Sequence, residues 1–233
     1  MATTAVTVSF LEQSIAVLRM QRGENRINPE FLRAYNGCLD KLESAPGCKG
    51  VVTTGEGKFF SNGIDLDWMG KEENAEKVPT FMEDFQKLLA RILIFPLPTV
   101  AAINGHCYAG GAVLALAHDL RVMNSQRGWM CLNEIHRNLR FSPFLLSLLR
   151  MKMNPGQTLN RALVLGQRFT AEEAVSAGLV DKSMPALLVE QESRRLLLSW
   201  LGKDGYSRES LLNMKRDVYS DVLNSPTKFN SLM

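Results

Sequence analysis

The stretch of residues 96–119 constrains this chain most. Its apolar run Thr99–Ile103 predicts a buried strand, Asn104-Gly105 a tight turn, and Gly110-Gly111 the start of a helix of small apolar residues. Adjacent glycines free the backbone and allow close approach of another group. The first N–H groups of a helix lack partners and lie at the positive end of its dipole, so they can hold an anion, or an oxygen that becomes one during a reaction. A packing turn before a core helix is the alternative interpretation.

Composition places the chain among ordinary globular proteins. Its 233 residues suffice for one large domain, or for a domain with an appendage. A net charge of +3 without a Lys/Arg run argues against a nucleic-acid partner. No apolar run reaches the roughly 18 residues of a membrane helix, so we expect no membrane partner. The cysteines show no metal-ligand spacing, which predicts reduced structural thiols and no metal site: Cys38, Cys48, Cys107 and Cys131.

Strand and helix patterns alternate along most of the chain. Strands are predicted at Val6–Phe10, Ile15–Met20, 50–54, Thr99–Ile103, 120–123, 129–132 and 179–180. Helices are predicted at Pro29–Glu43, from about Asp65, at 78–94, from Gly110, at 143–150 and 155–165, from Thr170, and at 185–201 and 207–223. This order predicts an α/β body, in which a β-β-α rhythm recurs twice, followed by a helical tail.

Two loops with glycines, 63–65 and 109–111, each follow a strand and open a helix, and two converging N–H groups make an oxyanion hole. The chain carries Gly-x-Gly-Lys-x-Phe-x-x-Gly-x-Asp-Leu at 55–66, then Pro-x-x-Ala-x-Ile-Asn-Gly at 98–105, then Gly-Gly-Ala at 110–112. With Asn28-Pro29 and residues 172–180, this order resembles the crotonase (enoyl-CoA hydratase/isomerase) superfamily over nearly the whole chain.

The resemblance implies a crotonase-like spiral of β-β-α turns over residues 1–180 and a C-terminal helical trimerisation segment over 181–233. It implies an acyl-CoA thioester substrate, with coenzyme A part of that substrate and no other cofactor, and a homotrimer or dimer of trimers. The carbonyl oxygen would lie against the backbone N–H groups of Ile64 and Gly110. The other substrate-binding positions would be Lys58, Ser61, Asn62, Gly63, Asp65, Leu66 and Gly111, and the acyl pocket would include Trp68, Met69 and Phe81, for which plain core packing is the alternative.

The carboxylates indicate which reaction to expect. Hydratases of the superfamily use two glutamates, and the position of the first is Val113 here, whereas the second matches Glu134. One glutamate suffices for Δ3,Δ2-enoyl-CoA isomerisation in fatty-acid β-oxidation, where it moves a 3-cis or 3-trans double bond to 2-trans. Glu134 would take the C2 proton and return it to C4, which requires a pKa raised by apolar neighbours such as Trp129 and Ile135.

Alternatives remain at this stage. They are another crotonase-type enzyme, such as a weak enoyl-CoA hydratase, or a non-catalytic acyl-CoA-binding protein, with Glu134 a surface residue. The basic neighbours His136, Arg137 and Arg140 could lower the pKa of Glu134 or redirect activity. Lys215 is expected on a solvated helix face.

The last tripeptide, Ser231-Leu232-Met233, resembles the Ser-Lys-Leu signal for peroxisomal import, and the start lacks a secretory or mitochondrial leader pattern. We therefore expect a peroxisomal protein, with the cytoplasm as the alternative.

Overall fold

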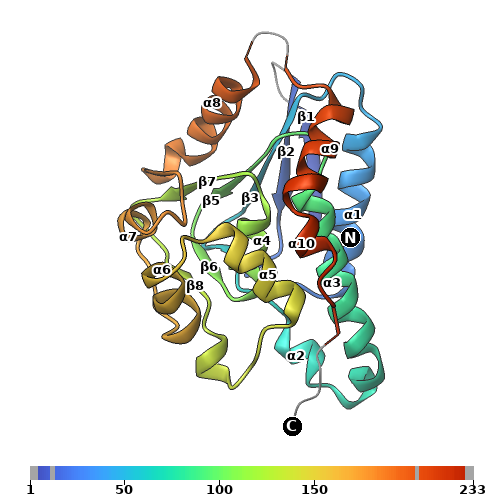
Figure 1. Cartoon of the computed structure of the whole chain (residues 1–233), viewed down its shortest axis with the longest axis vertical. Helices are drawn as coiled ribbons and strands as arrows, with labels where there is room; N and C mark the ends of the chain where they lie inside the picture. Colours follow the sequence, from blue (N-terminus) through green and yellow to red (C-terminus); the bar gives the residue numbers. More distant parts are fainter. Residues whose placement is uncertain (1–4, 11–13, 203–204, 229–233) are drawn as a thin grey trace.

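The computed structural model describes residues 5–10, 14–202 and 205–228, and its centre is a six-stranded sheet (Figure 1). The strands lie in the order β1 (Val6–Phe10), β2 (Ile15–Met20), β3 (Gly50–Gly55), β5 (Thr99–Ile103), β7 (Leu120–Asn124) and β9 (Lys182–Met184). The pair β1 and β2 is antiparallel, as expected for the hairpin, and every other neighbouring pair is parallel.

The strand expected at 179–180 is wrong, because the strand lies at Lys182–Met184. The N–H groups of Leu179 and Val180 both still donate to the Ala174 carbonyl of the preceding helix, so the chain joins the sheet only after them. The large sheet therefore continues past residue 180, where we had expected the body to end.

Three short parallel strands form a second sheet, in the order β4 (Phe59–Ser61), β6 (His106–Tyr108) and β8 (Met130–Cys131). Each directly follows a strand of the large sheet, namely β3, β5 and β7, and each leads into helical structure. The β-β-α rhythm thus recurs along the chain as the sequence predicts. The strands predicted from the sequence do not include β4 and β6, because a strand of three residues has too few positions to show alternation.

Helices cover both faces of the large sheet (Figure 1). Successive strand residues point to opposite faces. Leu18 and Ala101 belong to the main core with α1, α3, α4 and α5, whereas Val17 and Val100 pack with Leu197 of α8. The helices up to residue 152 are α1 (Pro29–Glu43), α2 (Leu66–Met69), η2 (Glu72–Lys77), α3 (Val78–Leu93), α4 (Gly110–Ala117), η3 (Glu134–Arg137) and α5 (Pro143–Lys152). They are followed by α6 (Gln157–Leu159), the π-helical η4 (Asn160–Val164), α7 (Ala171–Ser176), η5 (Ala186–Leu188), α8 (Val189–Leu201), α9 (Arg208–Val218) and α10 (Ser220–Leu223).

The C-terminal helices pack against the body of their own chain. The helix expected at 207–223 is interrupted at Tyr219, and α10 lies against α5 with Val222 fully buried. Lys215 of α9 is also buried, so the expected solvated lysine is wrong. Its ammonium group lies 2.7 Å from the Asp119 carboxylate and also donates to the Phe95 and Leu97 carbonyls. This partly buried ion pair joins α9 to the end of α4.

Candidate active site

The three strands of the small sheet all point their carboxyl ends toward one site. The residue Ile64 lies three positions after β4, Gly110 two positions after β6, and Glu134 three positions after β8. Because the carboxyl ends of parallel strands meet at one edge of a sheet, residues distant in sequence are brought together there. The three positions that the sequence singles out for chemistry therefore share one location.

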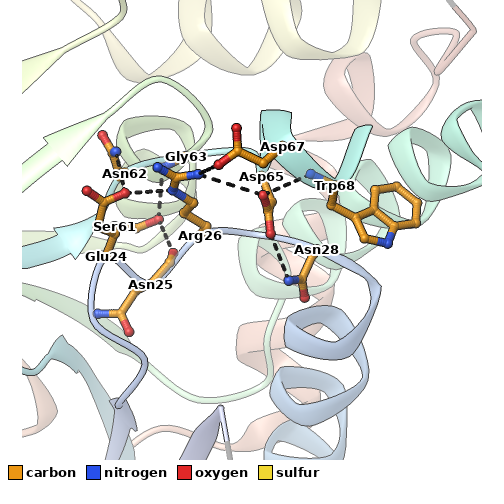
Figure 2. A network of polar contacts seen from close by, with 10 residues as sticks. All are labelled: Glu24, Asn25, Arg26, Asn28, Ser61, Asn62, Gly63, Asp65, Asp67 and Trp68. Carbon is orange, nitrogen blue, oxygen red and sulfur yellow. Dashed lines mark hydrogen bonds and ion pairs between the residues drawn. The ribbon is translucent and has the colours of Figure 1, made fainter. Parts of the chain in front are cut away.

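A polar network holds the loop that carries Ile64 (Figure 2). Arg26 forms ion pairs with Glu24 at 2.6 Å, with Asp65 at 3.9 Å, and with Asp67. The carboxylate of Asp65 also accepts hydrogen bonds from the Trp68 N–H, capping α2, and from the Asn28 side chain. The loop is thus fixed from both sides, and Asp65 acts as a structural anchor.

Backbone pairing decides where the Ile64 N–H points. Ile27 donates to the Gly63 carbonyl at 2.8 Å and accepts from the Asp65 N–H at 2.9 Å, as one residue does in a parallel bridge to Ile64. In such a bridge the N–H of the middle residue points away from the partner strand. Ile64 therefore directs its N–H toward the opposite side, where α4 begins.

The start of α4 is set by an unusual backbone conformation. Ala109 has φ 48° and ψ −124°, in the left-handed half of the map that residues with a Cβ rarely occupy. Its N–H donates to the Cys131 carbonyl, and its own carbonyl accepts from the N–H groups of Ala112 and Val113. These bonds hold the strained turn, which presents the N–H of Gly110 as the first donor of the helix.

The two loops touch one another. A Cβ at Gly63 would lie 3.1 Å from the Gly110 nitrogen, and a Cβ at Gly110 would lie 3.3 Å from the Ile64 side chain. Among the residues that the structure describes, neither the Ile64 N–H nor the Gly110 N–H has a hydrogen-bond acceptor. Two unpaired donors lying this near one another suit an oxygen atom that gains negative charge.

A pocket of about 930 Å³ opens beside these donors, and Ile64, Gly110, Val113 and Glu134 all line it. Its walls are largely apolar and come from the α2–α3 region, from α5 and its approach, and from the end of the described chain. They include Leu66, Met69, Val78, Met82, Phe85, Tyr108, Leu139, Phe141, Leu145, Thr227 and Lys228. A volume of this size is typical of a site for a small organic ligand.

Glu134 has the properties of a base held out of water. Burial raises the pKa of its carboxyl group to about 7. Its Oε2 atom is buried and has no hydrogen-bond partner among the described residues. The expected lowering by the basic neighbours is absent, because the one effect that lowers the pKa of Glu134 is a hydrogen bond from its own backbone. His136 packs toward Gly166, and Arg137 and Arg140 line the pocket.

Two expected neighbours of Glu134 lie elsewhere. Trp129 packs on His106 with ring centroids 5.3 Å apart, and Ile135 is half exposed. The carboxylate instead shares the pocket with apolar side chains such as Val113 and Phe141, which the strand pattern around Glu134 gave no reason to select.

The other expected binding residues either line the pocket or support its loops, except Lys58, which does neither. Asn62, Leu66 and Met69 line the pocket, as do Ile64 and Gly110. Ser61, Gly63, Asp65 and Gly111 support the loops: the Ser61 hydroxyl, for example, donates to the Asn25 carbonyl and accepts from the Gly63 N–H. Lys58 does not line the pocket, and its ammonium group lies over the Phe59 ring.

Trp68 and Phe81 also lie away from this pocket. Their rings pack edge to face at 5.0 Å and line a separate hollow of about 890 Å³ between α1 and α3. The α3 side chains that do line the pocket are Val78, Met82 and Phe85. Helical spacing could have found that apolar face, but it does not tell a pocket wall from core packing.

No group of three metal-ligating side chains occurs within the ranges that the structure describes. Over those same ranges, no helix is both long and apolar enough to cross a membrane.

Comparison with known proteins gives a consistent result. Residues 11–231 match the family model described as enoyl-CoA hydratase/isomerase. The chain is 34% identical over 166 residues to the peroxisomal enoyl-CoA delta isomerase 2 of Arabidopsis thaliana, covering 69% of each chain. It is 31% identical over 216 residues to the mitochondrial enoyl-CoA delta isomerase 1 of Rattus norvegicus, covering 91% of this chain and 74% of that one.

The fold agrees with these matches. The crystal structure of human mitochondrial delta3-delta2-enoyl-CoA isomerase superposes with a TM-score of 0.84 at 28% identity, over 94% of this chain and 90% of that one. The sheets, the spiral order and the sequence matches together place this chain in the enoyl-CoA hydratase/isomerase family of the crotonase superfamily.

Proposed function

We propose that this chain is a Δ3,Δ2-enoyl-CoA isomerase, in which Glu134 is the acid and base and the N–H groups of Ile64 and Gly110 form the oxyanion hole. The observation that carries the proposal is the Glu134 carboxyl group, with its pKa raised to about 7, in the same pocket as two unpaired backbone donors. Two further carboxylates line this pocket: Asp67, which is paired with Arg26, and Glu83 on α3. Relatives named as enoyl-CoA delta isomerases add support.

The proposed reaction moves one proton between two carbons. The C2 hydrogen of a 3-enoyl thioester is acidic, because the carbanion is conjugated with both the carbonyl and the double bond. Ionised Glu134 takes this proton, and the charge that develops on the thioester oxygen is held by the two N–H groups. The protonated carboxyl group then delivers the proton to C4, which leaves the double bond between C2 and C3. The reaction needs no redox partner, metal or further cofactor.

The side chain at Val113 favours isomerisation over hydration. Adding water to a double bond requires that water be both deprotonated and oriented, for which a second carboxylate is well suited. Val113 lines the pocket as a buried hydrocarbon side chain and can do neither. At the position of Val113 no second carboxylate stands beside Glu134, which favours a one-base reaction.

The test is conversion of 3-cis- and 3-trans-hexenoyl-CoA to the 2-trans isomer, with hydration of the product followed in the same samples. We expect isomerisation by the wild type and a loss of about 1000-fold in kcat for Glu134→Gln, which keeps the shape but removes the base. The control Glu73→Gln changes an exposed glutamate of η2 outside the pocket and should retain the wild-type rate.

The same assay decides between the alternatives. Tight binding of the thioester without turnover would point to an acyl-CoA-binding protein. Hydration faster than isomerisation would make the chain a hydratase, and a full rate in Glu134→Gln would place the base elsewhere.

We further propose a homotrimer or a dimer of trimers. Large apolar side chains are exposed on the surface of the described chain, among them Leu187, Trp200 and Met214, and association would cover some of them. Sedimentation equilibrium would reveal a trimeric or hexameric mass, and a monomer at micromolar concentration would disprove this assembly.

A peroxisomal location is proposed on the match to relatives that are named peroxisomal, although others are named mitochondrial. The expected signal, Ser231-Leu232-Met233, lies outside the described residues. A fluorescent protein that carries residues 224–233 should collect in peroxisomes, and a diffuse signal would contradict this location.

A further inference from the structure

The end of the described chain forms part of the pocket wall. After α10 the backbone runs along α5 and α3, and Thr227 and Lys228 line the same pocket as Glu134 and Ile64. The Pro226 carbonyl accepts a hydrogen bond from the Phe144 N–H at 3.1 Å. We call residues 226–228 the C-terminal strap.

One side chain fastens this strap to two other walls of the pocket. Gln86 of α3 is fully buried, and its Nε2 group donates to the Thr227 carbonyl at 2.9 Å and to the Met82 carbonyl at 3.0 Å. Its Oε1 atom accepts from the Ser142 hydroxyl at 2.6 Å. Ser142 in turn caps α5, on the segment that leads from Glu134. The Gln86 amide therefore links α3, the C-terminal strap and the start of α5, all of which contribute residues to the pocket wall.

The walls that meet at Gln86 are mostly apolar and suit a hydrocarbon chain, with Glu83 on α3 and Lys228 on the strap as charged lining residues. The Gly110 donor lies next to Phe85, since a Cβ at Gly110 would be 3.4 Å from the Phe85 ring. The wall continues through Met82 on α3 and through Phe141 and Leu145 near the start of α5. A thioester whose carbonyl lies at the donors would place its apolar acyl group against these side chains, because burial of apolar surface is favourable there.

We propose that Gln86 is a specificity-determining positioning residue, which holds the C-terminal strap as the wall that limits acyl-chain length. This rests on the proposed thioester site but does not require turnover. Gln86 touches no substrate: it acts by fixing the strap. Without its amide the strap loses its side-chain hydrogen bond, and the pocket gains room for longer acyl chains.

Two variants test the proposal in opposite directions. Gln86→Met keeps the volume but removes the amide, so the ratio of kcat/KM for 3-dodecenoyl-CoA to that for 3-hexenoyl-CoA should rise at least about fivefold. Thr227→Trp leaves the hydrogen bond from Gln86 intact, because that bond goes to the Thr227 backbone carbonyl. The larger side chain fills space at the strap, so the same ratio should fall at least about fivefold. Gln167→Met, which removes another amide that bonds Arg161 outside the pocket, is the matched control and should leave the ratio unchanged.

Binding separates this proposal from the proposed function. Dissociation constants for saturated hexanoyl-, dodecanoyl- and hexadecanoyl-CoA, measured by calorimetry, report chain-length preference without any reaction. The length dependence of binding should shift toward long chains in Gln86→Met and toward short chains in Thr227→Trp. Unchanged length dependence in both variants would overturn the strap proposal even if isomerisation is found, and a shift in binding would uphold it even if turnover is absent.

Discussion

The burial that would make the Glu134 carboxyl group a base near neutral pH also lowers the stability of the folded protein when that group is ionised. Burial raises its pKa to about 7, so the ionised form that catalysis needs is the form the surroundings disfavour. No cation is hydrogen-bonded to its Oε2 atom within the described chain. Two measurable consequences follow from this single shift.

The first concerns the pH dependence of the reaction. A base must be deprotonated to act, so kcat/KM for 3-hexenoyl-CoA should be level above about pH 7 and fall about tenfold per pH unit below it. The parameter kcat/KM is the appropriate one, because it reports the ionisation of the free enzyme. A midpoint near the ordinary value of a glutamate would show that burial does not control this carboxyl group.

The second concerns stability. The folded state holds the Glu134 proton more tightly than the unfolded state, since the pKa is raised from 4.5 to about 7, so stability falls as pH rises through that window. Gln does not titrate. The free energy of unfolding of Glu134→Gln should therefore match the wild type near pH 4 and exceed it by on the order of 3 kcal/mol above pH 7. Urea unfolding at both pH values measures this, and an equal difference at the two would contradict it.

At the scale of elements, the proposed oxyanion hole depends on how closely α4 approaches β4. A Cβ at Gly111 would lie 2.5 Å from the Ser61 carbonyl oxygen, so only glycine allows the helix to start there. Because Ser61 also bonds to Asn25 and Gly63, its movement would disturb the loop that carries Ile64.

We therefore expect Gly111→Ala to lower the free energy of unfolding by about 1–3 kcal/mol and to reduce isomerisation, because the two donors move apart. The control is Gly37→Ala, in the interior of α1, where a Cβ meets nothing within 4 Å. That change should raise stability by about 0.5–1 kcal/mol through helix propensity, without affecting the rate. Urea unfolding and the hexenoyl-CoA assay measure both, and equal effects of the two alanines would disprove the close-approach argument.

The sequence could predict the parts of the site that local patterns specify. Gly110, Ile64 and Glu134 each follow a strand at a fixed short distance, so motif spacing places them without knowledge of the packing. Gln86 could not be selected in this way. Its partners Ser142 and Thr227 are far along the chain, and nothing near it in sequence tells a buried, bonded glutamine from an ordinary helix residue.

For the same reason, only Met69 of the three residues expected at the acyl pocket lines the cavity beside the donors. Apolar spacing on α3 identifies a buried face, yet Phe81 and Phe85 on that face lie toward different hollows. Which of them lines the pocket depends on the angle at which α3 meets α1, α4 and α5, and that angle is a property of the assembled core.

At the scale of the whole molecule, the C-terminal helices complete the body to which they are attached. The start of α9 is tied to the end of α1, since the Arg208 guanidinium donates to the carbonyls of Glu43, Ala45 and Cys48. Further along, Lys215 reaches the Asp119 carboxylate at the end of α4, the same helix whose first N–H belongs to the proposed oxyanion hole. The C-terminal segment thus holds both the far end of α4 and, through the strap, the pocket wall.

This arrangement makes Lys215→Met a test of how the tail is held. Asp119 would keep its hydrogen bonds from the Thr99 N–H and hydroxyl but would lose its buried cation. Lys215 is buried but the Asp119 side chain is 22% exposed, so the loss should be smaller than the roughly 3–5 kcal/mol of a fully buried pair. We expect the free energy of unfolding to fall by about 2 kcal/mol, and proteases to cut within α9 and α10 before the body. Lys87→Met, which breaks the exposed pair with Asp84 on α3, should change stability by less than about 1 kcal/mol. Similar losses in the two variants, or cleavage that begins in the body, would show that the Lys215 pair does not anchor the C-terminal helices.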